Sequence, residues 1–189
     1  MGVLKASDSL ATVAFAVGDA LRRHGVVAVM TGGACATWFS GGEYQSSDVD
    51  FVTQGDPQQR LVDEALRELG FSRERDRYVH PKLPYIVEFP PGPLAIGADH
   101  DIRPVQIAAA GTRIRSLSAT DACRDRLAAF YHWNDRQSLE VAVAIARRHK
   151  LDLKKIRAWS EAEGMGEKHE RFRAALQQRR RRPRRARKQ

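Results

Sequence analysis

Two aspartates separated by one residue, Asp48 and Asp50, have the spacing of a metal site. Side chains alternate between the two faces of a strand, so residues two apart point the same way, about 6.5–7 Å from each other. Two such carboxylates repel each other unless a cation lies between them, and magnesium prefers carboxylates combined with substrate phosphates. Val49 and Phe51 would then face the core. A surface turn with two solvated aspartates would give the same pattern, so the pair alone does not decide.

A glycine pair, Gly32-Gly33, precedes the aspartates and lies between a predicted strand and a predicted short helix. Glycine lets the backbone approach a ligand closely, and the N-terminus of a helix offers free N–H groups that suit a phosphate. An ordinary tight turn would explain the pair alone. The order of strand, glycine pair, helix and Asp-x-Asp strand places a phosphate cradle beside a metal site. That combination favours attack on the α-phosphate of a nucleoside triphosphate.

The segment 30–52, MTGGACATWFSGGEYQSSDVDFV, resembles the signature of the DNA polymerase β-like nucleotidyltransferase superfamily. That signature is a hydrophobic residue, Gly, Gly or Ser, about a dozen residues, and then Asp, a hydrophobic residue, Asp or Glu, and a hydrophobic residue. The spacer here, residues 34–47, is slightly longer. The resemblance implies a nucleoside triphosphate substrate and a Mg²⁺ or Mn²⁺ ion bound by Asp48 and Asp50. It also implies nucleotide binding by Gly32, Gly33 and Ser47.

The third carboxylate of such sites normally comes from a later strand, and Glu88 is the candidate. The segment 85–89, YIVEF, has strand character, and the proline-rich segment 90–93 ends it abruptly. An exposed acid on an edge strand is the alternative interpretation. The expected catalytic and metal-binding set is therefore Asp48, Asp50 and Glu88.

A second resemblance lies in the segments 121–127, DACRDRL, and 132–137, HWNDRQ. Both are similar to a bacterial group related to the abortive-infection nucleotidyltransferase toxins, in which a Lys-Asp-Arg or similar tripeptide opens a helix near the triphosphate. The resemblance adds Arg124, Arg126 and Asp135 to the expected nucleotide-binding residues. Arg124 replaces the lysine of that tripeptide, so it keeps the charge but does not exchange protons near neutral pH.

These charged residues also have a structural interpretation. Asp125, Arg126, Asp135 and Arg136 would form ion pairs between two helices. We expect Trp133 to pack between helices and not to stack on a base.

Hydrophobic periodicity and turn residues predict the elements that position these residues. Helices are expected at 7–24, 34–39 and after Asp56-Pro57, which supplies an N-cap and a proline at the first helical position. Strands are expected at 26–30, 47–53, 77–80 and 84–89, with a hairpin of 105–108 and 112–117 around Gly111. From Ser118 the pattern is entirely helical, with helices at 119–131, 135–149, 152–163 and 167–178.

The predicted fold class is therefore α/β (α+β), with a small mixed β-sheet core, helices packed on it and a C-terminal helical bundle. The resemblance implies that this core is a nucleotidyltransferase core. We expect a core at 1–117, a helical subdomain at 118–178 and a basic tail at 179–189. The first helix should bury one apolar face and end at Gly25.

Composition indicates a soluble globular protein, with 189 residues, 42% hydrophobic and 29% charged. No apolar run is long enough to span a membrane and no signal peptide is recognisable, so a cytoplasmic protein is expected. Cys35 and Cys123 are expected to be reduced and buried, and none of the six histidines is assigned to a metal. Of the net charge of +9, eight charges lie in 179–189, RRRRPRRARKQ, which leaves +1 for the rest. Such a tail should be disordered by itself and could bind phosphate backbones, or it could be merely solvated.

The leading hypothesis is a toxin-like, bacterial nucleotidyltransferase that moves a nucleoside monophosphate from a triphosphate to an acceptor. RNA, especially tRNA, is the first choice of acceptor because the basic tail could hold it, and a cognate antitoxin is compatible with this hypothesis. Two alternatives stay open. One is an inactive nucleotidyltransferase fold that binds RNA, and the other is an enzyme with a protein or small-molecule acceptor.

Overall fold

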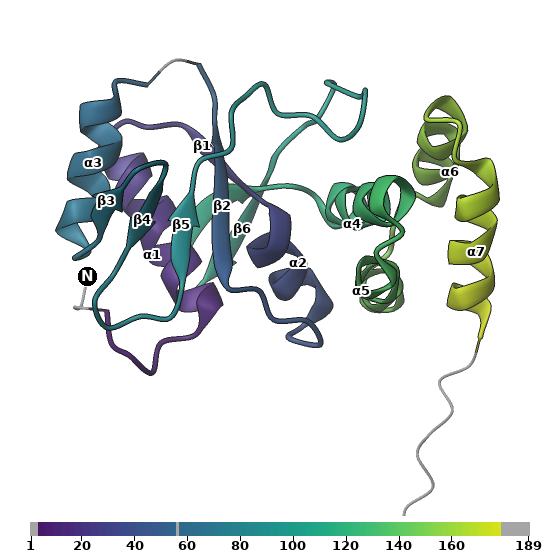
Figure 1. The fold of residues 1–189 in the computed structure, drawn as a ribbon, viewed down its shortest axis with the longest axis horizontal. Helices are drawn as coiled ribbons and strands as arrows, with labels where there is room; N and C mark the ends of the chain where they lie inside the picture. The colour runs from purple at the N-terminus through teal and green to yellow at the C-terminus, as the bar shows by residue number, and fades with distance from the viewer. Residues whose placement is uncertain (1–3, 56, 179–189) are drawn as a thin grey trace, which may run out of the picture.

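A computed structural model describes residues 4–55 and 57–178 (Figure 1). The elements in chain order are α1 (Leu10–Arg23), β1 (Ala28–Thr31), α2 (Gly32–Ser40), β2 (Asp48–Thr53), α3 (Gln59–Glu68), β3 (Ser72–Glu74), β4 (Arg77–Val79), β5 (Ile86–Glu88), β6 (Val105–Ala109), β7 (Thr112–Ser116), α4 (Ala119–Trp133), α5 (Arg136–Arg148), α6 (Leu153–Ala162) and α7 (Gly166–Gln177). The predicted tail at 179–189 lies outside the described residues.

The strands form one mixed sheet in the order β3-β4-β5-β2-β1-β7-β6. β1 is antiparallel to β2 and parallel to β7, and β2 is parallel to β5. In Figure 1 the sheet, α1 and α3 make up one half of the molecule, α4 to α7 make up the other, and α2 lies between them. This arrangement confirms the predicted fold class.

Local sequence accounts for the ends of several elements. Ser9 caps α1 by accepting a hydrogen bond from the Thr12 N–H. Ser118 caps α4, because its hydroxyl accepts the Asp121 N–H and donates to the Asp121 carboxylate. The predicted hairpin is confirmed as β6 and β7, with Gly111 in the left-handed region at the turn.

One part of the hydrophobic core lies between α1 and one face of the sheet, and the core continues into the helical half. Gly18 of α1 packs so closely on the sheet that a Cβ there would lie 2.7 Å from the Ile114 side chain. Val49 and Phe51 of β2 are completely buried, as expected from their alternation with the aspartates. Both cysteines are buried and free. Of the helices in the described part of the chain, none combines the length and apolar composition that a bilayer span requires.

Three expectations were wrong in detail. β3 was not predicted, because its residues Ser72–Glu74 are all exposed and carry no hydrophobic alternation. α3 begins at Gln59 with Gln58 as its N-cap residue, so Pro57 is not its first helical residue, and Asp56 lies outside the described residues. Trp133 does not pack between helices: it is 77% exposed. It is the last residue of α4, and the left-handed Asn134 turns the chain away immediately after it.

Candidate active site

Asp50 lies in a row of side chains that crosses neighbouring strands. Thr31 of β1 is paired with Asp50, and Asp50 is paired with Glu88 of β5. Directly paired residues share one face of a sheet, and Asp48 shares it because it is two residues from Asp50. The structure therefore brings the three predicted carboxylates to one face. β5 pairs with both β2 and β4, so Glu88 is not on an edge strand.

The glycine pair forms the first turn of α2 and contacts this row. Gly32 has a positive φ of 57°, and a Cβ there would lie 1.9 Å from a carboxylate oxygen of Asp50. A Cβ on Gly33 would lie 2.0 Å from the Ser46 hydroxyl. The Gly33 N–H donates to the Asp50 carboxylate at 3.4 Å. Both positions therefore require glycine, because the backbone passes where side-chain atoms would collide.

Two serines hold the other aspartate. The Ser47 hydroxyl donates to Asp48 Oδ1 at 2.5 Å, and the Ser46 hydroxyl donates to the same oxygen at 3.4 Å. The Ser46 N–H in turn donates to the Thr37 hydroxyl of α2. Ser47, predicted to bind the nucleotide, is thus bonded to a predicted metal ligand. Ser46 was not singled out from the sequence, because its place beside Gly33 arises only when the 41–47 loop folds back.

A cleft of about 400 Å³ opens at this end of the sheet. Asp50 and Gly32 line it together with Asp125 of α4. The loop after β5 supplies an apolar stretch of the lining, formed by Pro90, Pro91, Pro93, Leu94 and Ala95. The cleft is therefore shared by the sheet, the start of α2, the helical half and one long loop.

Electrostatic repulsion is concentrated on Asp50. Burial, followed by the negative charge of Asp48, raises the pKa of Asp50 from 3.8 to about 6, and the charges of Glu88 and Asp125 act in the same direction. Asp125 is paired with its neighbour Arg126, whose guanidinium donates to Asp125 Oδ2 at 2.7 and 3.1 Å. Burial acts to lower the pKa of Arg126, but the Asp125 carboxylate raises it above its ordinary value. The charges of Asp48, Glu88 and Asp125 thus all act on Asp50.

The donor chemistry fits a hard divalent cation. Carboxylate oxygens that repel one another are suitable ligands for Mg²⁺, which commonly takes one or two of them and completes its coordination with waters and substrate phosphates. Among residues 4–55 and 57–178, no three His, Cys, Asp or Glu side chains are gathered closely enough to hold a metal by themselves. The side chains therefore suit an ion whose coordination is completed by substrate phosphates and waters, and not an ion whose ligands all come from the protein.

Other predicted nucleotide-binding residues lie elsewhere. The Arg124 side chain is completely buried and is paired with Asp99 and Asp121, so it does not line the cleft and offers no exposed atom to a phosphate. Asp135 caps α5 by accepting the Gln137 N–H and the Ser138 hydroxyl, although its charge still interacts with Arg126. Arg126 is the member of this group that contacts a cleft carboxylate.

The cleft residue that the sequence interpretation left outside the site is Asp125. The sequence interpretation considered it only as a partner in an ion pair between two helices. The signal that could have identified it is its position in the tripeptide 124–126, since three consecutive helical residues point about 100° apart and cannot share one environment.

No protein-family model and no curated protein matches the chain. Among solved structures, an antigenic nucleotidyltransferase-like protein from Paracoccidioides brasiliensis is similar with a TM-score of 0.60 at 16% identity, over 91% of this chain and 94% of that one. Two structures of the antibiotic-resistance factor ANT(2'')-Ia, one in complex with adenylyl-2''-tobramycin and one in solution, have TM-scores of 0.49 at 15% and 14% identity. They cover 87% and 86% of this chain and 97% of each relative. The first similarity shows that the chain has a nucleotidyltransferase fold.

Proposed function

We propose that this protein is a metal-dependent nucleotidyltransferase that moves a nucleoside monophosphate from a triphosphate to an acceptor and releases pyrophosphate. The observation that carries the proposal is the meeting of the Gly32-Gly33 turn with the Asp50 carboxylate in one cleft. A helix N-terminus suits phosphate, and repelling carboxylates suit a cation. The partly buried Asp50 carboxylate does not stabilise the fold, because burial of an ionised group opposes folding.

Each residue has a role that follows from its place. Asp48 and Asp50 would hold Mg²⁺ or Mn²⁺, with Glu88 as the third carboxylate, and Ser47 would orient Asp48. The bound cation would balance the charge of the triphosphate and activate the attacking hydroxyl. The Gly33 N–H and the first turn of α2 would bind phosphate oxygens.

In the transfer itself, the acceptor oxygen forms a bond to the α-phosphorus while the bond to the pyrophosphate oxygen breaks. The proton of the acceptor hydroxyl must leave, and the cleft offers carboxylates to receive it. Asp125, which lines the cleft and is not one of the proposed cation ligands, is the proton acceptor that we propose.

RNA, in particular tRNA, is the acceptor that we propose first. Support comes from the charge distribution, since eight of the net nine positive charges lie in residues 179–189 and an arginine-rich segment binds phosphate backbones. A toxin-like role in a bacterial cytoplasm, neutralised by a cognate antitoxin, extends this proposal through the resemblance of residues 121–137 to the abortive-infection group.

The test is incubation of the purified chain with each α-labelled triphosphate, Mg²⁺ or Mn²⁺, and separate RNA, protein and small-molecule fractions. We expect label on RNA that disappears with Asp48→Asn and with Asp50→Asn. Asp101→Asn, which changes an exposed aspartate outside the cleft, is the matched control. Equal labelling by the wild type and both cleft variants would refute the proposal.

The alternatives give different results in the same experiment. Label on protein or on a small molecule would keep the enzyme and replace the acceptor. RNA binding without any label transfer, together with no calorimetric signal for Mg²⁺ or nucleotide, would favour an inactive RNA-binding fold.

A further inference from the structure

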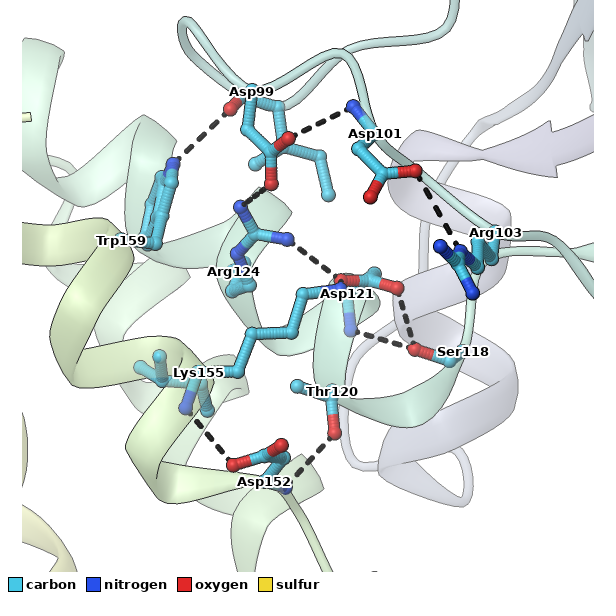
Figure 2. Close-up of polar contacts among 12 residues, drawn as sticks. Asp99, Asp101, Arg103, Ser118, Thr120, Asp121, Arg124, Asp152, Lys155 and Trp159 are labelled. Carbon is cyan, nitrogen blue, oxygen red and sulfur yellow. Dashed lines mark hydrogen bonds and ion pairs between the residues drawn. The ribbon is translucent and has the colours of Figure 1, made fainter. Parts of the chain in front are cut away.

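Arg124 is the centre of a buried polar cluster that joins the two halves of the molecule (Figure 2). Its guanidinium donates to Asp99 at 2.5 Å and to Asp121 at 2.8 Å, and it lies over the Trp159 ring at 4.9 Å from the centroid. Lys155 of α6 donates to the same Asp121 oxygen at 2.9 Å. Within the described chain, Nε of Arg124 has no hydrogen-bond partner. A buried cation is stable only when such partners are held in place.

The loop between β5 and β6, residues 89–104, is fastened to the helical half at three points. The first is the Asp99–Arg124 ion pair. The second is the Trp159 indole N–H, which donates to the Ile96 carbonyl at 3.1 Å. The third is the Ala98 N–H, which donates to Glu163 at 2.7 Å. All three anchors lie between residues 96 and 99.

The segment of the loop directly before these anchors is the apolar part of the cleft lining, residues 90–95. It follows Glu88 by one residue, so its position is fixed at one end by the sheet and at the other by Arg124, Trp159 and Glu163. A proline-rich stretch has few free dihedrals of its own. Its placement therefore depends on the two ends.

The helix that carries Arg124 also carries Asp125. Consecutive residues of a helix point about 100° apart, so one turn of α4 directs Arg124 into the buried cluster and Asp125 to the cleft. Fixing Arg124 against the loop therefore also fixes the distance between the loop and Asp125.

We propose that Arg124, Asp99 and Trp159 are positioning residues that set the apolar lining of the cleft and thereby the affinity for the substrate lying against it. This gives Arg124 a role different from direct phosphate binding. The effect on catalysis rests on the proposed function, because it requires the cleft to be the substrate site. The effect on the loop itself does not.

The first experiment measures amide hydrogen exchange in Asp99→Ala and in Asp101→Ala. Both variants remove one aspartate from the same loop, but Asp101 forms an exposed ion pair with Arg103, at 3.6 Å. We expect exchange at residues 94–98 to be at least tenfold faster in Asp99→Ala, with no such change in Asp101→Ala or in β1 and β2. Asp101 is left out because its N–H donates to Asp99 Oδ1 at 2.9 Å and would lose that bond in any case. Equal exchange in the two variants, or faster exchange throughout the sheet, would overturn the proposal.

Trp159→Phe provides a second variant that keeps an aromatic ring beside Arg124 but removes the indole N–H together with part of the ring. It should accelerate exchange at the same residues by a smaller factor. Arg124→Lys should not keep the slow amide exchange of the wild-type loop, because an ammonium lacks the planar guanidinium geometry that donates to two carboxylates at once. Wild-type exchange in Arg124→Lys would show that charge alone is sufficient and would contradict the geometric role.

The second experiment measures transfer kinetics with the labelled triphosphate. Asp99→Ala should raise KM at least fivefold and leave kcat within twofold, because the catalytic carboxylates are untouched. A fall in kcat at unchanged KM would refute a role in substrate affinity. If the wild type shows no transfer, the proposed function fails, whereas the exchange experiment still decides the positioning role.

Discussion

Replacing Asp50 by asparagine should stabilise the metal-free protein at neutral and alkaline pH. Asparagine has nearly the shape of aspartate and still accepts the Gly33 N–H, but it has no charge to bury beside Asp48. The pKa of Asp50 is raised from 3.8 to about 6 by burial and by neighbouring carboxylates. Because one pKa unit corresponds to about 1.4 kcal/mol, ionisation of Asp50 opposes folding by about 3 kcal/mol.

The sign of the pH dependence follows from the same shift. The folded chain binds this proton more tightly than the unfolded chain, so the free energy of unfolding falls as pH rises from about 4 to about 6. Above that interval the full penalty is present, and below it the penalty is absent. Asp50→Asn should therefore be more stable than the wild type by up to about 3 kcal/mol at pH 8 and nearly equal to it at pH 4.

Chemical denaturation in the presence of a chelator, at pH 4 and pH 8, measures this difference. Asp101→Asn, with an 80% exposed side chain, is the control and should match the wild type at both pH values. Saturating Mg²⁺ should then stabilise the wild type, by about 2.7 kcal/mol at one hundred times Kd, and leave Asp50→Asn unchanged. A variant that is less stable than the wild type at pH 8 would refute the reasoning.

Three further perturbations test other parts of the structure. Gly32→Ala should lower the free energy of unfolding by more than Gly25→Ala, as measured by urea denaturation. Both glycines have positive φ, but of the two only Gly32 has an atom within 4 Å of the new Cβ. Equal losses would show that the contact with Asp50 is unimportant. Asp125→Asn should lower the pKa of Asp50 in an NMR titration of the carboxyl carbons, since one repelling charge is removed, and an unchanged pKa would place Asp125 farther from the site. Deleting residues 179–189 should make RNA binding less dependent on salt. The slope of the logarithm of the binding constant against the logarithm of salt concentration, measured by fluorescence anisotropy, should become less steep by up to about 6. An unchanged slope would show that the tail does not bind RNA.

The parts of the site that lie close together in the sequence could be predicted from it. Alternation along one strand places Asp48 and Asp50 on one face and Val49 on the other, and it is a property of the backbone alone. The Gly32-Gly33 turn is similarly local, since positive φ and close approach favour glycine wherever the chain turns. Helix caps such as Ser118 depend on residues within one turn, which is why the helical half was predicted nearly residue by residue.

Tertiary structure decided the rest, because it depends on pairing and packing between segments far apart in the chain. Glu88 has the composition of a strand residue, but only the register of β5 against β2 places it opposite Asp50. Arg124 and Asp125 are adjacent in sequence, and one is buried while the other lines the cleft, because the 96–99 loop segment and Trp159 cover one side of α4. The tripeptide 124–126, Arg-Asp-Arg, indicates only that its side chains point in different directions. Which of them is buried and which lines the cleft is set by what packs against the helix.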